Sequence, residues 1–265
     1  MQPKLFRIIL GALFAALAAS CVMVMDPGRG EPWPANPEFR RTVDFAPGGV
    51  FALEHTLGDI VITGRDGDSA ELVATVRPEE SAESRVRVYA AADLEPSIDV
   101  RKAGSRLRIR TKSLGGPWSS GGLDYAIRLP HSVNLDPIVL EKGDISVSGV
   151  YGRMSVELGT GSLKVANFSG PLKASVESGQ ADVELLDVRP DDVVQVTVGE
   201  GDIVLRLEPG AGARIEAEAP RAEITSDFDL GRSLPARTLD GRLGSGEARI
   251  VLRALRGNIR ILKTG

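Results

Sequence analysis

Glycines recur at a fixed step of 9 residues through the middle of the chain, and this step limits the folds open to it. Apolar or small residues follow each glycine at offsets of two and four, with mostly polar residues between them. Such alternation is typical of a strand with one buried face, and a fixed step between strands is typical of a stacked repeat. The glycines are Gly143, Gly152, Gly161, Gly170 and Gly179. The stretch from Gly143 to Leu207 therefore predicts a β-solenoid.

The repeat continues beyond this stretch with interruptions. The segment from Gly58 to Gly64 matches that from Gly143 to Gly149, and both Gly246 and Gly257 precede alternating apolar residues. Between the first repeat and the regular ones we predict hairpin-like insertions in the N-terminal half. The strands expected in these insertions are Glu71 to Val76, Arg85 to Ala90, Ile98 to Arg101 and Leu107 to Thr111. The predicted fold class is all-β, a parallel solenoid that places like residues over like.

The composition suits a solenoid and excludes some partners. Of the 265 residues, 42% are hydrophobic but only 5% are aromatic, as expected for a core of stacked aliphatic side chains. The net charge of −4 argues against nucleic acid as a partner, because phosphate binding needs a basic surface. A single cysteine excludes a disulfide within the chain.

The N-terminus has the pattern of an export signal. Lys4 and Arg7 precede an apolar run from Ile8 to Ala18, which is shorter than the roughly 20 residues that span a bilayer. The run ends in LAASC at Cys21, which resembles a bacterial lipobox, and in such signals the cysteine is acylated and becomes the first mature residue. We predict a signal peptide over residues 1–20 and lipidation of Cys21. A plain secretory signal cleaved nearby is the alternative.

Residues 21–38 form a proline-rich segment after the signal. Its four prolines disfavour helix and sheet interiors and favour an extended chain, so we predict a tether, followed by a solenoid domain over residues 39–265. We expect Trp33 to make an interfacial or end-capping contact. Val22 in place of Asp after the cysteine is compatible with outer-membrane sorting. The predicted location is the cell envelope, on the periplasmic or surface-exposed side of the outer membrane.

Four short elements occur in an order that resembles a known family. They are Gly58 to Gly64, Tyr125 to Pro130, Gly143 to Gly149 and Arg256 to Ile261. In this order they are similar to the bacterial domain of unknown function 4097, described as a putative adhesin, over roughly residues 40–265. The resemblance implies a right-handed parallel β-helix in the cell envelope, and it carries over no catalytic residues.

A glycine- and serine-rich loop contains a possible ligand contact. The stretch SLGGPWSSGG, from Ser113 to Gly122, predicts a surface loop. Trp118 lies in its middle, and an exposed aromatic ring in a polar loop can serve as a binding platform. We favour the interpretation in which Trp118 folds back to cover the edge of a coil, and ligand contact is the alternative.

No motif in the chain predicts catalysis, a metal or a cofactor. His55 and His131 have no nucleophile or metal partner nearby in sequence, and the adjacent Asp191 and Asp192 predict a solvated turn rather than the two facing carboxylates of a glycosidase. The corner column that could mimic a calcium β-roll reads Asp144, Ser162, Gln180 and Asp202. This column cannot repeatedly supply the six or more oxygens that calcium needs. We therefore expect no catalytic, cofactor-binding or metal-binding residue.

Two basic runs occur at strand spacing. One extends from Arg106 to Lys112 and the other from Arg249 to Lys263. A charged, solvent-facing edge protects a sheet from pairing with another chain, and we predict that role for the first run. The alternative is contact with acidic glycans or lipid headgroups.

Together these features predict a lipid-anchored envelope protein that presents a rigid β-helical surface for adhesion or interaction and is not an enzyme. The expected partners are the membrane, through the anchor, and a protein or glycan that the sequence does not identify. Two alternatives stay open. One is an envelope-stress or regulatory accessory that binds another protein, and the other is a β-helix that binds or cleaves polysaccharide.

Overall fold

The computed structural model describes residues 38–77, 97–112, 122–230 and 236–264. These residues lie in the unit Asn36–Gly265, which is separate from the unit Met1–Ala35. The described residues form an all-β structure of two ten-stranded sheets, which confirms the predicted class. Cys21, Trp33, Trp118 and the strand predicted from Arg85 to Ala90 lie outside the described residues.

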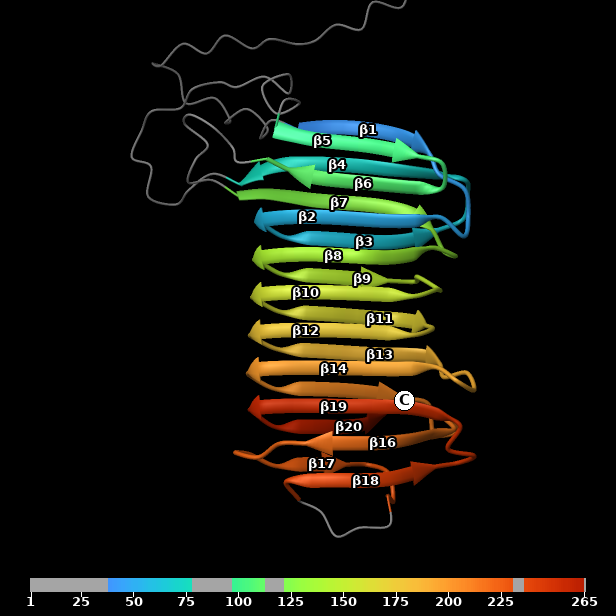
Figure 1. Cartoon of the computed structure of the whole chain (residues 1–265), viewed down its shortest axis with the longest axis vertical. Coiled ribbons are helices and arrows are strands. Elements are labelled where there is room, and N and C mark those ends of the chain that lie inside the picture. The colour runs from blue at the N-terminus through green and yellow to red at the C-terminus, as the bar shows by residue number, and fades with distance from the viewer. Residues whose placement is uncertain (1–37, 78–96, 113–121, 231–235, 265) are drawn as a thin grey trace, which may run out of the picture. The chain divides into compact units, whose positions relative to one another are not determined.

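Both sheets run from strands near the N-terminus to strands near the C-terminus (Figure 1). Sheet A contains, in spatial order, β1 (Glu38–Asp44), β4 (Ser69–Arg77), β7 (Gly122–Pro130), β3 (Ile60–Arg65), β9 (Ile145–Ser148), β11 (Leu163–Ser169), β13 (Ala181–Asp187), β15 (Ile203–Leu207), β20 (Ile259–Lys263) and β17 (Ile224–Ser226). Sheet B contains β18 (Thr238–Leu243), β16 (Ala213–Glu218), β19 (Ala248–Arg256), β14 (Val193–Glu200), β12 (Leu172–Ser178), β10 (Met154–Thr160), β8 (Asn134–Lys142), β2 (Val50–Leu57), β6 (Arg106–Thr111) and β5 (Ile98–Ala103).

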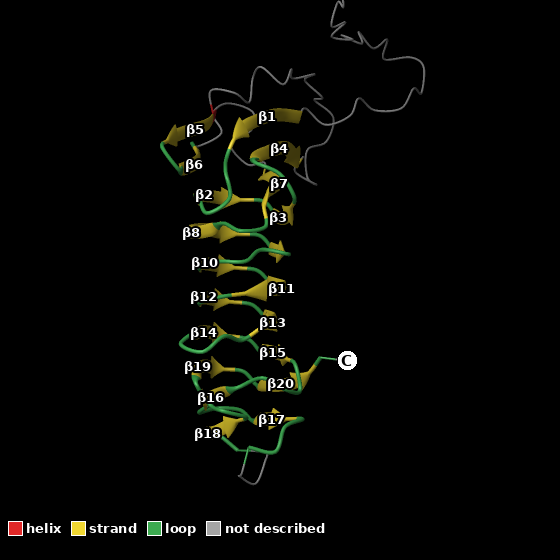
Figure 2. Ribbon diagram, turned by 90° about the vertical axis from the view of Figure 1, so that its right-hand side faces the viewer, coloured by secondary structure: helices red, strands yellow, loops and turns green. Residues whose placement is uncertain are grey.

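In the middle of the domain the chain alternates between the two sheets. Each strand from β8 to β13 pairs in parallel with the strand two places later in the chain, and the two sheets face each other across one core (Figure 2). One repeat therefore contains one strand of each sheet. This arrangement explains why the glycine step is half of the 18-residue repeat.

The apolar positions of the repeat lie in register and form the core. Val165 pairs with Val147 on one side and Val183 on the other, as the alternation predicts. The Val165 side chain is 1% exposed, whereas its neighbour Lys164 is exposed. Because like residues stack on like, each added strand extends the same aliphatic rows and buries them from water.

The glycines at one corner of the repeat are required by close backbone contacts. A Cβ atom on Gly161 would lie 1.8 Å from the carbonyl oxygen of Gly143, and a Cβ atom on Gly179 would lie 1.8 Å from that of Gly161. Both glycines also have positive φ angles, 141° and 142°, which L side chains rarely adopt. The recurrent glycine therefore marks the point where each coil touches the next.

The strands at the two ends depart from chain order. β19 lies between β14 and β16, and β20 lies between β15 and β17. The last two strands of the chain are therefore inserted into the sheets, and they separate β14 and β15 from the strands β16 to β18 that follow them in the sequence. The predicted insertions of the N-terminal half pair antiparallel, β4 with β1 and β7, and β5 with β6. They extend the two sheets.

The mostly polar sequence from Asp227 to Leu243 predicts a polar insertion, and the structure contradicts this prediction for the residues that it describes. Phe228, Leu230, Leu239 and Leu243 are all less than one-tenth exposed and belong to the core cluster. Leu230 packs against Gly241 of β18, where a Cβ atom would approach it to 2.8 Å. This segment therefore covers apolar residues at the C-terminal end of the sheets.

Candidate functional site

The structure describes some of the residues weighed for chemistry and not others. Cys21 and Trp118 lie outside the described residues, so their predicted roles stay predictions. His131 stacks on Tyr151, with ring centroids 5.4 Å apart, and its Nδ1–H donates to the carbonyl oxygen of Gly149 at 2.6 Å. These contacts hold the imidazole against a turn.

The pair Asp191 and Asp192 forms a turn, as the sequence predicts, but only Asp191 is exposed to solvent and Asp192 is buried. Asp191 has a positive φ of 68°. The Asp192 side chain is 8% exposed and accepts a hydrogen bond from the backbone N–H of Arg189 at 2.9 Å. Asp192 thus stabilises the turn between β13 and β14.

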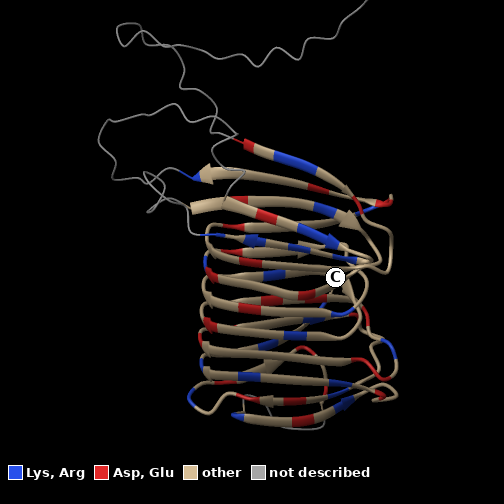
Figure 3. Ribbon diagram, turned by 45° about the horizontal axis from the view of Figure 1, so that its top comes forward, with Lys and Arg blue, Asp and Glu red and all other residues tan. Residues whose placement is uncertain are grey.

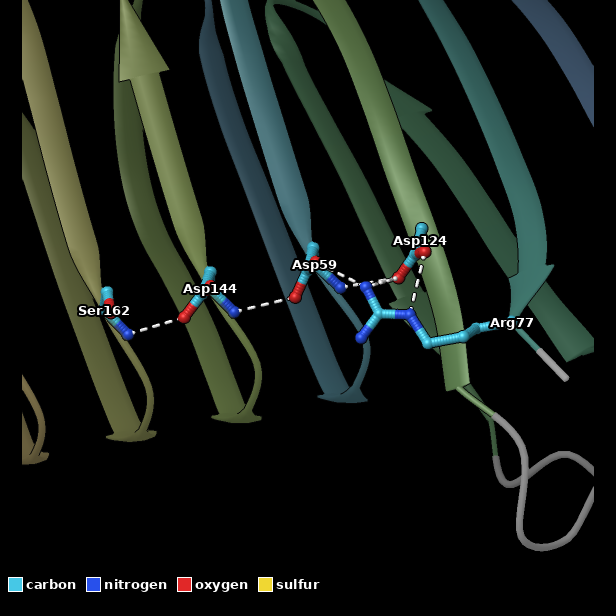
Figure 4. A network of polar contacts seen from close by, with 5 residues as sticks. All are labelled: Asp59, Arg77, Asp124, Asp144 and Ser162. Carbon is cyan, nitrogen blue, oxygen red and sulfur yellow. Dashed lines mark hydrogen bonds and ion pairs between the residues drawn. The ribbon is translucent and has the colours of Figure 1, made fainter. Parts of the chain in front are cut away.

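A ladder of aspartates runs along the corner at which the strands of sheet A begin (Figure 4). The Asp124 carboxylate accepts the backbone N–H of Asp59 at 2.8 Å, Asp59 accepts that of Asp144 at 2.9 Å, and Asp144 accepts that of Ser162 at 2.7 Å. At one end of the ladder Arg77 pairs with both Asp59 and Asp124. Each carboxylate therefore bonds to the next repeat and joins the coils.

The same corner continues towards the C-terminus. The Asp202 carboxylate accepts the backbone N–H of Asn258 at 2.8 Å, and the Asn258 side-chain oxygen accepts that of Glu223 at 3.2 Å. Within the described ranges no group of three or more His, Cys, Asp or Glu is placed to hold a metal ion. The side-chain oxygens of the corner residues accept hydrogen bonds from backbone N–H groups of the neighbouring coils.

The outer face of sheet B carries a charged depression near the C-terminal end. It has a volume of about 370 Å³ and lies over β16, β18 and β19. Arg214 contacts Asp240 at 2.8 Å, Arg249 contacts Glu216 at 2.9 Å, and Arg253 contacts Glu218 at 3.3 Å. Part of the second basic run is therefore matched by acids on the neighbouring strands.

The first basic run lies on the hairpin of β5 and β6, at the other end of sheet B. The Glu54 carboxylate on β2 accepts hydrogen bonds from both Arg108 and Arg110. The Arg108 guanidinium, and then that of Arg110, holds the pKa of Glu54 below its usual value. Arg101 pairs with Asp99 at 2.9 Å. Figure 3 shows how Lys and Arg alternate with acids over the strands.

A buried polar cluster joins the two sheets, and sequence reasoning missed it. The Thr111 hydroxyl lies 3.0 Å from His55 Nδ1 and 2.7 Å from the phenol oxygen of Tyr125, so it links the two side chains by hydrogen bonds. The His55 and Tyr125 rings meet edge to face, with centroids 5.1 Å apart. All three occupy inward positions of the alternation, which is the signal that could have revealed the cluster.

Burial sets the protonation of this cluster. Loss of water around the ring lowers the pKa of His55, and the backbone carbonyls of Leu123 and Leu57 act in the opposite direction. Burial also raises the pKa of Tyr125 to about 12, although its bond to Thr111 opposes the shift. The cluster is therefore neutral in the folded protein at pH 7. It lies inside the core.

Comparison with solved structures shows that the fold is similar to that of a protein described as a putative cell adhesion protein. A putative cell adhesion protein from Clostridium sporogenes ATCC 15579 matches 86% of this chain and 100% of its own, with a TM-score of 0.53 and 14% identity. A putative adhesin from Bacteroides fragilis NCTC 9343 matches 87% of this chain and 99% of its own, with a TM-score of 0.47 and 12% identity. At 14% identity, the first likeness shows a shared fold only.

No family model matches the chain. No curated protein matches it in sequence. The resemblance to the domain of unknown function 4097 therefore stays a prediction. Among the residues that the structure describes, no helix is long and apolar enough to cross a membrane.

Proposed function

We propose that residues 39–265 form a right-handed parallel β-helix that presents a rigid surface for adhesion or interaction. The in-register stacking of Val147, Val165 and Val183 supports a coil with one strand in each sheet. The corner ladder supports rigidity, because it adds a hydrogen bond from side chain to backbone between successive coils. A stacked core of this kind holds its outward side chains in a fixed array.

The proposed location is the cell envelope, with Cys21 lipidated after removal of residues 1–20 and residues 21–38 acting as a tether. The proposed side is the periplasmic or the surface-exposed side of the outer membrane. The support is the lipobox-like LAASC sequence that ends at the only cysteine of the chain. The outer-membrane assignment rests on Val22. Neither a cofactor nor catalysis belongs to this proposal.

Metabolic labelling tests the anchor. A fatty-acid analogue should label the wild-type chain and leave Cys21→Ser unlabelled, and the wild type should fractionate with membranes. Equal labelling of the two chains would remove the anchor from the proposal.

The observation that carries the interaction role is the fold shared with a putative cell adhesion protein, together with the array of polar side chains on the outer face of sheet B. Cells that express the chain should attach to a host-cell or matrix-coated surface in greater number than cells that lack it. Changing Ser175 and Thr197, adjacent outward residues of β12 and β14, to arginine should reduce attachment while the melting temperature stays the same. Attachment that does not depend on the protein would overturn the interaction role.

An accessory that binds another protein is the second candidate. The depression over β16, β18 and β19 favours it, because alternating Arg and Glu side chains can be matched by opposite charges on a partner protein. Polysaccharide binding or cleavage is the third candidate, through Trp118. Release of product from a panel of envelope polysaccharides would favour an enzyme and would contradict the non-catalytic role.

A further inference from the structure

The hairpin of β5 and β6 has the highest density of positive charge among the described segments. From Ser97 to Lys112 it contains six Lys or Arg residues and one acid, a net charge of +5 within a chain whose net charge is −4. The cationic residues are Arg101, Lys102, Arg106, Arg108, Arg110 and Lys112. All six are exposed. The hairpin therefore differs sharply in charge from the rest of the chain.

Acids nearby neutralise only part of this charge. Asp99 pairs with Arg101, and Glu54 pairs with Arg108 and Arg110. The hydrogen bond from Arg101, and then the nearby charges of Lys112 and Arg110, hold the pKa of Asp99 below its usual value. The remaining cations, Lys102, Arg106 and Lys112, form no ion pair within the part of the chain that the structure describes. These three residues keep their charge available for a ligand.

The hairpin lies at the same end of the domain as β1, the first described strand (Figure 1). β5 is the edge strand of sheet B, and β1, which begins at Glu38, is the edge strand of sheet A at the same end of the stack (Figure 1). Sixteen residues, Val22 to Pro37, separate Glu38 from Cys21. Fully extended, the chain from Cys21 to Glu38 reaches at most about 60 Å. A lipid on Cys21 would therefore hold the hairpin close to a membrane and raise its effective concentration there.

We propose that the β5–β6 hairpin binds the anionic headgroups of the membrane to which the chain is anchored, so that the N-terminal end of the domain faces the lipid. This inference rests on the proposed lipid anchor. Arg101, Arg106, Arg108 and Arg110 share one face of the two strands, and Lys102, which pairs in register with Leu107, lies on the other face. The cations therefore lie on both faces of this end of sheet B, which would meet an array of phosphates. Such contact also covers the edge of β5, which has no second strand partner among the described residues.

Vesicle binding by the full chain carrying Cys21→Ser tests the contact, because no acyl chain then contributes. The hairpin variant is Lys102→Gln with Arg106→Gln and Lys112→Gln, and it leaves every observed ion pair intact. The matched control is Arg153→Gln with Lys164→Gln and Lys173→Gln, which removes the same charge from exposed positions in the middle of the domain. Sedimentation compares phosphatidylglycerol vesicles with phosphatidylcholine vesicles for each chain.

We expect the hairpin variant to lose about a hundredfold in affinity for phosphatidylglycerol vesicles, since each cation near an anionic surface contributes roughly fivefold. The control should lose little, and added salt should weaken the binding of the unmodified hairpin. Equal losses in both variants, or equal binding to the two lipids, would overturn the proposal. Binding to an anionic polysaccharide but not to vesicles would also overturn it. Labelling at Cys21 is independent of this result, so failure of the anchor and failure of the hairpin are distinguishable.

Discussion

At the scale of single residues, the corner glycines are the least replaceable positions of the domain. In Gly161→Ala the new Cβ atom would overlap the carbonyl oxygen of Gly143 at 1.8 Å, at a φ of +141°. We expect a loss of at least about 2 kcal/mol in the free energy of unfolding. Gly210→Ala is the control, because its Cβ atom would meet nothing within 4 Å. Urea titration of both variants measures the difference, and equal midpoints would contradict the close contact.

The buried cluster predicts a pH dependence of stability on the acid side. The pKa of His55 lies below its usual value in the folded protein, so the unfolded chain takes up a proton first as the pH falls. Stability should therefore be complete above the ordinary pKa of about 6.5 and should decline below it. The variant His55→Phe removes this group and should flatten the decline between pH 7.5 and 5 in urea titrations, about the range in which an unfolded histidine titrates. If the stability of His55→Phe falls with pH as steeply as that of the wild type, the decline does not come from His55.

Tyr125 predicts a loss of stability on the alkaline side. Its pKa is raised to about 12, so the unfolded chain loses the phenol proton first as the pH rises. Stability present below pH 10 should fall by about 3 kcal/mol by pH 12. The variant Tyr125→Phe should lose less over this range, and chemical unfolding at successive pH values measures it. A fall of the same size in both chains would assign the effect to other groups.

At the scale of strands, the alternation of inward and outward residues could be predicted from the sequence. Val165 was expected between Val147 and Val183, and the structure confirms that register. Alternation reports burial directly, because only one face of each strand meets the core. The polar cluster was not predicted, because the rule assigned inward positions to apolar residues. Thr111 and His55 occupy such positions and are joined by a hydrogen bond between segments far apart in the chain.

A charge placed on the inward face should disrupt a coil. The variant Val165→Asp would bury an unpaired carboxylate, and we expect it to cost about 4 kcal/mol or to unfold the neighbouring coils. Lys173→Asp is the matched outward control, expected within about 0.5 kcal/mol, because its partners in register are the uncharged Ser155 and Gln195. Lys164 is less suitable, since Asp182 lies beside it. Similar thermal melts for the two variants, followed by circular dichroism, would refute the assignment of faces.

At the scale of the whole domain, chain order and spatial order differ, and the sequence does not predict where. The glycine and its apolar residues recur in nearly the same form before β15 and β20, so no local signal says which strands are neighbours. The order is decided by pairing between segments far apart in the chain, such as β14 with β19. The covering of the C-terminal end of the core was likewise not predicted, because the apolar residues among 227–243 are spread through a mostly polar sequence.

This order predicts an unusual response to truncation. Ending the chain after Glu247 removes β19, which lies between β14 and β16, and β20, which lies between β15 and β17. Because β16 would lose its parallel partner, we expect residues 213–243 to lose protection from hydrogen exchange, while β10 and β12 keep theirs as the control within the same sample. A solenoid stacked strictly in chain order would lose only its terminal coil and would keep residues 213–243 protected. That outcome would show that β16 does not depend on β19, contrary to the observed pairing.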